Sequence, residues 1–322
     1  MNSRHLVDPE LLPALDAFPA TRWSRENYLA TRAMVAELTP RSSWSDGPDV
    51  ETTEQHVPGP HDAPDVRVLI HRPTKASEPR PVLFHIHGGG YVIGLPEMTA
   101  LYHRGVVREL DCVVVSVDYR LAPETPYPGP LEDCYAALKW VFGHAEKLGI
   151  DPGRIAIGGE SAGGGLAAAL AVLARDRGEV PIIFQLLIYP MIDDRTVAGK
   201  DPHPYTGEFV WDAHNNRFGW SSYLGAEPGA DDISNYAAAA RTKNLIDLPP
   251  TYLSVGSLDL FLDENVDYAM RLTRAGVPTE LHVYPGAFHG YPISPEADIT
   301  KFSAANALRA LRRAFVTKDA TA

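Results

Sequence analysis

Residues 159–163, GESAG, hold a serine in a pattern that suits nucleophilic catalysis. Ser161 follows an apolar, strand-like stretch and precedes a helical stretch of small residues. On a tight turn between a strand and a helix, a serine hydroxyl projects above the sheet, and the close approach of the chain requires glycine two residues to either side. We therefore interpret Ser161 as a nucleophile. The alternatives are a capping serine on a glycine-rich turn and a phosphate-binding loop, although the lysine of such a loop is missing.

Three consecutive glycines in the stretch HGGG at residues 87–90 match a second need of this chemistry. Attack of a serine on a carbonyl carbon creates an oxyanion, and each preorganised N–H group that faces it contributes roughly 3 kcal/mol. A side chain would obstruct such groups, so glycine is a suitable carrier. We assign this role to the N–H groups of Gly88 and Gly89, together with that of Ala162 after the nucleophile.

A serine nucleophile needs a base, and histidine titrates in the required range. Among the 12 histidines, His289 directly follows the last strand-like segment, whereas His282 lies within it and His214 lies in a long insertion. We predict His289 as the base; the alternative is a loop histidine that caps a helix. His85 and His87 form an H-x-H pair that could bind a metal. A structural role is favoured for both, because carboxylate or cysteine ligands are missing from the neighbouring sequence.

An acid should follow the strand-like segment at residues 251–259, which gives the chain order Ser, Asp, His. Asp259 ends that segment, and Asp263 and Glu264 start the helical segment after it. Acids in the first turn of a helix complement the helix dipole, so we choose Asp259 and keep Asp263 as the second choice. The role of Asp259 would be to fix the imidazole tautomer and stabilise the imidazolium without itself taking a proton.

Alternating strand-like and helical segments would position these residues. Most strand-like segments are continuous apolar runs, as expected for strands buried on both faces of a parallel sheet, and the order favours a doubly wound α/β domain. The strand-like segments are residues 51–57, 65–73, 81–87, 112–119, 154–160, 182–190, 251–259 and 280–286. The helical segments are residues 98–110, 130–149, 162–178, 263–276 and 296–315.

Two regions depart from this alternation. Residues 1–45 look helical before the sheet begins. Residues 192–250 are too long for an ordinary connection, since loops beyond about 15 residues are usually functional. We interpret both regions as parts of a cap over the carboxyl edge of the sheet, with residues 46–191 and 251–322 as the catalytic domain. The alternative is that both decorate another part of the surface.

Composition and charge indicate which cellular compartment and which binding partners to expect for this chain. The formal net charge of −12 argues against a polyanionic partner such as nucleic acid. Apolar runs stay well below the roughly 20 residues of a membrane span, and a signal-peptide pattern is missing, so we expect a cytoplasmic protein.

Cys112 and Cys134 lack CxxC spacing and metal-type neighbours, so we expect two buried free thiols. The segment at 280–285 and the helix after it would form a sheet edge, where we expect a homodimer.

The motifs in their order resemble the hormone-sensitive lipase group of α/β hydrolases, which includes the bacterial family IV esterases. They are HGGG at 87–90, DYRLAPE at 118–124, GESAGG at 159–164, an aspartate after a strand, and FHG at 288–290. The resemblance implies the α/β-hydrolase fold, with a mostly parallel eight-stranded sheet flanked by helices, and a helical cap. It also implies a serine carboxylesterase without cofactor or metal, which hydrolyses short-chain acyl esters through a Ser-His-Asp triad and an acyl-enzyme.

The resemblance also assigns individual positions. The triad positions are Ser161, Asp259 and His289, and the oxyanion positions are Gly88, Gly89 and Ala162. The segment at 118–124 falls on a structural motif behind the oxyanion loop. Two residues depart from the family: Glu160 stands where Asp or Thr is more frequent, and Leu260 where Pro is frequent. The first departure bears on pH response or substrate choice, and the second on the geometry at Asp259.

Several aromatic residues are candidates to line a substrate pocket, with packing between cap and sheet as the alternative. They are Tyr91, Tyr189, Phe209, Trp211, Phe218 and Trp220. A small aromatic pocket favours short acyl groups, because an apolar pocket discriminates by roughly 1–3 kcal/mol per methylene.

Two rival functions are an amidase or peptidase, because the same triad cleaves both bonds, and a non-catalytic ligand receptor on a hydrolase scaffold. The presence of all three catalytic groups disfavours the receptor.

Overall fold

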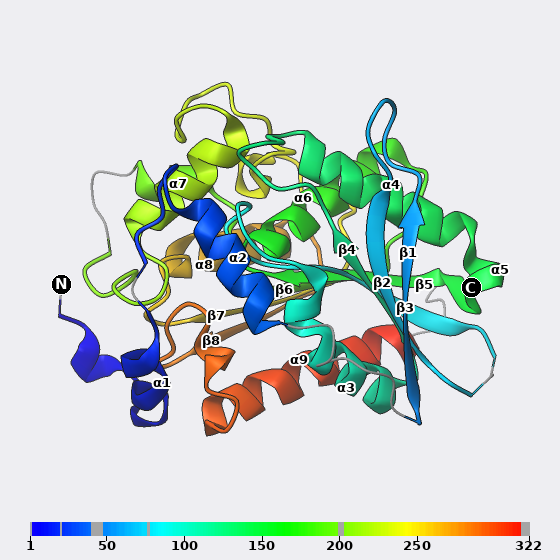
Figure 1. Cartoon of the computed structure of the whole chain (residues 1–322), viewed down its shortest axis with the longest axis horizontal. Helices are drawn as coiled ribbons and strands as arrows, with labels where there is room; N and C mark the ends of the chain where they lie inside the picture. The colour runs from blue at the N-terminus through cyan, green and yellow to red at the C-terminus, as the bar shows by residue number, and fades with distance from the viewer. Residues whose placement is uncertain (1, 20, 40–47, 76–77, 199–202, 317–322) are drawn as a thin grey trace.

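A computed structural model describes residues 2–19, 21–39, 48–75, 78–198 and 203–316. Its centre is one sheet in which all eight strand-like segments form strands (Figure 1). The strands are β1 (Val50–Val57), β2 (Val66–Pro73), β3 (Arg80–Ile86), β4 (Val113–Asp118), β5 (Ile150–Glu160), β6 (Phe184–Ile188), β7 (Thr251–Gly256) and β8 (Thr279–Tyr284). The predicted eight-stranded sheet is confirmed.

The strand order is β1-β2-β4-β3-β5-β6-β7-β8. Strand β2 runs antiparallel to β1 and to β4, and the other neighbours pair in parallel, so the sheet is mostly parallel as predicted. Every residue of β7 is buried, as expected for a strand that is covered on both faces. Because the strands from β3 to β8 are parallel, their carboxyl ends meet at one edge of the sheet. The loops after β3, β5, β7 and β8 begin there.

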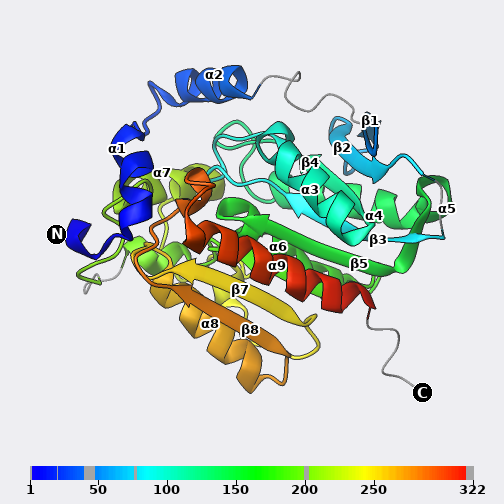
Figure 2. The same ribbon diagram turned by 90° about the horizontal axis from the view of Figure 1, so that it is seen from below.

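Helices cover both faces of the sheet. One face carries α3 (Ala100–Leu110) and α9 (Asp298–Val316); the other carries α4 (Gly129–Gly143), α6 (Ala162–Arg177) and α8 (Leu262–Arg274), with the short α5 (Ala145–Leu148) after α4 (Figures 1 and 2). Neighbouring residues of one strand point to opposite faces, so Leu83 packs with α3 and α9 while Phe84 packs with α4 and α6. Among the described residues, no helix combines the length and apolar character needed to cross a membrane.

Helix α6 is buried along most of its length. Residues 162–174 are all Ala, Gly, Leu or Val, and all of them are buried. Small side chains let this helix approach the sheet closely. At Gly163 the approach leaves no room for a side chain, because a Cβ atom there would lie 2.0 Å from the carbonyl oxygen of Ile86. The turn between β5 and α6 is thereby pressed against the end of β3.

The two regions outside the alternation lie against each other. The first contributes α1 (Leu12–Ala17) and α2 (Tyr28–Leu38), and the second contributes α7 (Ala213–Leu224). The backbone N–H of Trp23 donates to Oδ1 of Asn215 at 2.8 Å, and the Trp23 and Trp211 rings meet edge to face with centroids 5.0 Å apart. The division into cap and catalytic domain stays a prediction; its boundary at residue 45 and the C-terminal residues 317–322 lie outside the described residues.

Candidate active site

Ser161 occupies the turn between β5 and α6 in a strained conformation. Its φ is 55° and its ψ is −122°, a region that residues with a Cβ atom rarely adopt. The backbone of β6 and the loop after it hold this conformation. The Ser161 N–H donates to the carbonyl of Ile188 at 3.0 Å, and the Ser161 carbonyl accepts from the N–H of Met191 at 2.9 Å. The turn therefore keeps the hydroxyl at the carboxyl edge of the sheet.

Three side chains from separate loops meet at this turn. Oγ of Ser161 lies 2.9 Å from Nε2 of His289, which follows β8. Nδ1 of His289 lies 2.8 Å from Oδ2 of Asp259, which follows β7. The aspartate is fully buried, and the serine and histidine are each less than one tenth exposed. The structure thus brings together the three residues that the sequence suggested as nucleophile, base and acid.

The Asp259 carboxylate is fixed from its other side. Its Oδ1 atom accepts a hydrogen bond from the backbone N–H of Phe261 at 2.9 Å, so that both oxygens have partners. Leu260, at the position where the family often has proline, does not prevent this geometry. Asp263, the second choice from the sequence, is exposed on the first turn of α8.

Aromatic rings hold the imidazole of His289 in place. The Tyr189 ring meets it edge to face with centroids 4.9 Å apart, and the Phe261 ring does so at 5.0 Å with an interplanar angle of 87°. The Trp211 ring lies beside it at 6.0 Å. These contacts restrict rotation of the imidazole, and they place apolar surface around the Ser161–His289 bond.

The glycine loop after β3 lies directly beside the nucleophile. A Cβ atom on Gly88 would lie 3.5 Å from Cβ of Ser161 and 2.9 Å from the carbonyl oxygen of Glu160. Within the described ranges, no hydrogen bond occupies the N–H groups of Gly88, Gly89 or Ala162. These groups are therefore free to donate to an oxyanion that forms next to Ser161.

His87 supports the glycine loop from within the protein. Its Nδ1 atom lies 2.8 Å from the carbonyl oxygen of Gly88, and because a carbonyl only accepts, Nδ1 carries the proton. Burial lowers the pKa of His87, which keeps the ring neutral. The Tyr119 ring stacks on it at 4.3 Å and donates its hydroxyl to the His87 carbonyl at 2.9 Å. Tyr119 belongs to the segment 118–124, which accordingly lies behind the loop.

His85 binds the residue that precedes the nucleophile, and sequence reasoning missed this contact. Nε2 of His85 lies 2.9 Å and 3.0 Å from the two carboxylate oxygens of Glu160, and its Nδ1 lies 3.3 Å from Oγ of Ser116. The H-x-H pattern drew attention to His85 but not to its partner. The contact depends on the register of β3 against β5, which pairs His85 with Gly158.

The predicted pocket residues divide into two groups. Tyr189 and Trp211 contact His289, and Phe209 packs against Phe288 with centroids 6.1 Å apart. Tyr91 and Trp220 are instead core residues, because each is at most 1% exposed and neither can wall an accessible pocket. Tyr91 stacks on Tyr223 at 4.1 Å. Phe218 is partly buried against the same core cluster.

A small cavity opens where α1 meets the inserted region. Its volume is about 240 Å³, and its lining includes Phe18, Phe209 and Val210. Val210 connects the cavity to the base, since a Cβ atom on Gly290 would lie 3.7 Å from its Cγ1. The cavity therefore adjoins the loop that carries His289.

Among the described residues, no group of three His, Cys, Asp or Glu side chains is arranged to hold a metal ion. Cys112 and Cys134 are buried and unpaired, as predicted, and burial raises the pKa of the Cys112 thiol to about 12.

Comparison with known proteins gives consistent matches. The family model Abhydrolase_3, described as alpha/beta hydrolase fold, matches residues 83–293. Esterase LipI of Mycobacterium tuberculosis is 36% identical over 307 residues, with 88% of each chain covered. Carboxylesterase NlhH of the same organism is 36% identical over 292 residues, again with 88% of each chain covered.

Solved structures match over almost the whole chain. A structure titled bacterial heroin esterase has a TM-score of 0.91 and 42% identity, and the match covers 98% of this chain and 100% of that one. Esterase LipW from Mycobacterium marinum has a TM-score of 0.87 and 34% identity, with 98% of each chain covered.

Proposed function

The chain is a carboxylic ester hydrolase of the hormone-sensitive lipase-like group of α/β hydrolases, and we propose that it cleaves short-chain acyl esters with Ser161, His289 and Asp259 as its catalytic triad. One observation carries this proposal. The Ser161 hydroxyl, the His289 imidazole and the Asp259 carboxylate form a continuous chain, with 2.9 Å and 2.8 Å between the bonded atoms.

The buried acid sets the direction of proton transfer. The Asp259 carboxylate can only accept a hydrogen bond, so Nδ1 of His289 carries the proton and Nε2 presents a lone pair to the Ser161 hydroxyl. As Oγ attacks the ester carbonyl carbon, Nε2 takes the hydroxyl proton. Asp259 stabilises the resulting imidazolium and stays ionised.

The carbonyl oxygen gains negative charge during this attack. We assign its stabilisation to the N–H groups of Gly88, Gly89 and Ala162, and each donor of this kind lowers the barrier by roughly 3 kcal/mol. The tetrahedral intermediate then collapses, the C–O bond to the alcohol breaks, and the imidazolium returns its proton to the leaving oxygen. The product is an acyl-enzyme on Ser161. Water, deprotonated by His289, attacks that ester, and the acid leaves as Ser161 regains its proton.

The packing around the triad supports a short acyl group. Gly90 has a φ of +57°, and a Cβ atom there would lie 2.3 Å from the Trp211 ring, so Trp211 packs directly on the glycine loop. Tyr189 and Trp211 border the imidazole. Apolar walls at this distance restrict an extended acyl chain, and each methylene accounts for roughly 1–3 kcal/mol of discrimination.

Replacement of Ser161 by Ala, assayed across an acyl series, tests the proposal. With p-nitrophenyl acetate, butyrate, octanoate and palmitate, we expect kcat/KM to be highest at acetate or butyrate, and Ser161→Ala to abolish turnover while circular dichroism stays unchanged. An acyl adduct on Ser161 should be visible by mass spectrometry after rapid quenching. Near-wild-type turnover by Ser161→Ala would refute the assignment of Ser161 as the nucleophile. A maximum of kcat/KM at palmitate would refute the proposed preference for short acyl chains.

Amide substrates separate the ester hydrolase from its closest enzymatic rival. The matching p-nitroanilides present the same acyl group to the same triad. We expect their kcat/KM to lie at least about 10³-fold below that of the esters, because an amine is the poorer leaving group. Comparable rates would indicate an amidase.

A further inference from the structure

A second cavity lies away from the triad, where the inserted region meets α8. Its volume is about 650 Å³, which falls within the roughly 300–1,000 Å³ of small-molecule sites. Its walls come from three parts of the chain: η5 (Asp194–Val197), the loop that contains η6 (Ala239–Arg241), and α8. Ser161, His289 and Asp259 do not line it.

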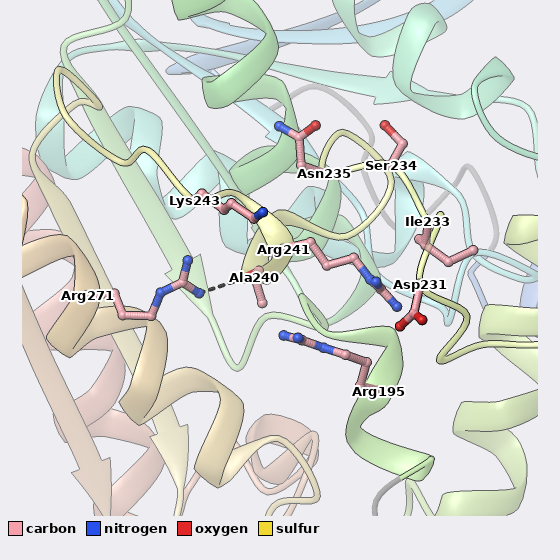
Figure 3. Close-up of a pocket in the computed structure, with 9 residues that line it drawn as sticks. All are labelled: Arg195, Asp231, Ile233, Ser234, Asn235, Ala240, Arg241, Lys243 and Arg271. Atoms are coloured by element: carbon pink, nitrogen blue, oxygen red, sulfur yellow. Dashed lines mark hydrogen bonds between the residues drawn. The ribbon is translucent and has the colours of Figure 1, made fainter.

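The wall of this cavity is cationic. Arg195, Arg241, Lys243 and Arg271 line it, and Asp231 is the one acid among its lining residues. Arg195 and Arg241 are ion-paired with Asp193 and Asp194 beside the cavity, so the remaining positive charge of the wall comes from Arg271 and Lys243. Figure 3 shows the guanidinium groups of Arg195 and Arg271 directed toward one another across the opening, with Arg241 and Lys243 on the loop between them.

Arg271 is held in position by neutral groups. Its Nη1 donates to the carbonyl of Ala240 at 2.6 Å, and its Nη2 donates to the carbonyl of Thr242. These bonds orient the guanidinium without cancelling its charge. Its ion-pair partner Asp267 lies 3.8 Å away with a side chain that is 68% exposed, so solvent screens this pair.

Arg241 and Arg195 are fixed by acids that do not line the cavity. Arg241 binds both oxygens of the buried Asp194 at 2.6 Å and 2.8 Å, and Arg195 binds both oxygens of Asp193 at 2.8 Å and 2.7 Å. A guanidinium has five N–H donors, so each of these arginines keeps donors for a ligand. The aspartates occupy the Nε and Nη2 edge of each guanidinium, so the donors left for a ligand are on Nη1 and the outer N–H of Nη2.

Lys243 supplies a cation from the loop that contains η6. Within the described ranges, no hydrogen bond or ion pair involves its ammonium group, and the side chain is exposed at the cavity. Its long side chain lets the ammonium adapt to a ligand held by the more rigid arginines.

We propose that this cavity binds a compact phosphate-bearing anion with more than one phosphoryl group. Guanidinium forks bind phosphate oxygens in pairs, and cations on three chain segments suit a ligand that presents oxygens in several directions. The volume exceeds that of a single phosphate. Bound there, the ligand would connect η5 and the η6 loop to α8, which begins three residues after Asp259.

Calorimetric titration with sodium pyrophosphate at fixed ionic strength tests the proposal. We expect saturable binding of one pyrophosphate per chain, with inorganic phosphate at least about tenfold weaker. The double variant Arg195→Gln, Lys243→Gln should raise the Kd at least about tenfold. Lys301→Gln on α9 removes an exposed lysine elsewhere and should leave the Kd unchanged.

Three outcomes would overturn the proposed site. The first is a pyrophosphate titration whose binding heat does not saturate, and the second is an unchanged Kd in the double variant. The third is an increase in Kd for Lys301→Gln as large as that for the double variant. Tighter binding of citrate than of pyrophosphate would overturn the phosphate assignment in favour of a carboxylate ligand. Hydrolysis of p-nitrophenyl butyrate by the double variant should stay at the wild-type level, because neither residue contacts the triad. Binding and ester hydrolysis can therefore fail independently.

Discussion

Glu160, the residue before the nucleophile, holds the imidazole of His85 at the end of the neighbouring strand. Oε2 of Glu160 lies 2.9 Å from Nε2 of His85, whose side chain is 2% exposed. A carboxylate accepts, so Nε2 carries the proton. This contact ties the nucleophile turn after β5 to β3, the strand that leads into the oxyanion loop.

Loss of the Glu160 side chain should therefore weaken both stability and turnover. Glu160→Ala leaves a buried N–H of His85 unpaired, which costs about 1–3 kcal/mol, and we expect kcat to fall several-fold. Glu160→Gln keeps a carbonyl acceptor and should restore most of both. Urea denaturation and p-nitrophenyl butyrate kinetics measure the effect. Glu227→Ala, at an exposed ion pair with Arg217, is the control, and equal effects in Glu160→Ala and Glu227→Ala would refute the role.

The two candidate acids can be separated by matched substitutions. Asp259→Asn keeps the shape of the side chain but offers an amide donor to Nδ1 of His289, which favours the wrong tautomer. We expect kcat to fall by roughly 10³–10⁴. Asp263→Asn changes an exposed residue and should leave kcat within about twofold. The assignment is wrong if the larger loss appears in Asp263→Asn.

Gly88 should tolerate no side chain. A Cβ atom there would lie 2.9 Å from the carbonyl oxygen of Glu160, so Gly88→Ala must move the oxyanion loop away from Ser161. A displaced donor costs about 10²-fold in kcat. Gly105→Ala in α3 is the matched control, because nothing outside its chain neighbours and its own helix backbone lies within 4 Å of the added methyl group. It should stabilise the protein by up to about 1 kcal/mol with unchanged kcat. A kcat for Gly88→Ala equal to that of the control would contradict this placement.

The buried histidine His71 should make the protein sensitive to acid. Burial, with Arg104 and His85 nearby, lowers the pKa of His71 to about 4, although Glu97 opposes this. The unfolded chain takes up this proton below about pH 6.5, so the free energy of unfolding falls as the pH drops from about 6.5 to 4. We expect a loss of about 2 kcal/mol from this group between pH 7 and pH 5, measured by urea denaturation. His71→Gln should flatten the slope; an unchanged slope would argue against the assignment.

The edge strand β8 is the surface on which we propose a homodimer. It ends the sheet, Val283 on it is 41% exposed, and Phe302 on α9 is 65% exposed. Unpaired strand edges can pair with a second copy. Light scattering should give the mass of a dimer, and Val283→Lys should shift it toward monomer. A monomer mass for the unchanged chain would rule the dimer out.

The sequence could identify the strands, the nucleophile turn and the glycine loop because each depends on local chain geometry. Continuous apolar runs indicate strands buried on both faces, and glycines flanking Ser161 indicate a tight turn. His289 and Asp259 could be selected from their places after the last two strands. In a parallel sheet, the residues that follow successive strands lie at the same edge. Chain order alone therefore indicated His289 and Asp259 as candidates for the site of Ser161.

Contacts between distant segments could not be predicted in this way. The partner of His85 depends on the register of β3 against β5. The burial of Tyr91 and Trp220 depends on how the inserted region packs against the sheet. The cationic cavity needs η5, the η6 loop and α8 in one place. Residue type and spacing determined what chemistry this chain can perform, because those preferences act within a few residues. Only the tertiary structure decided which side chains touch, because packing joins residues whose separation along the chain carries no signal of their contact.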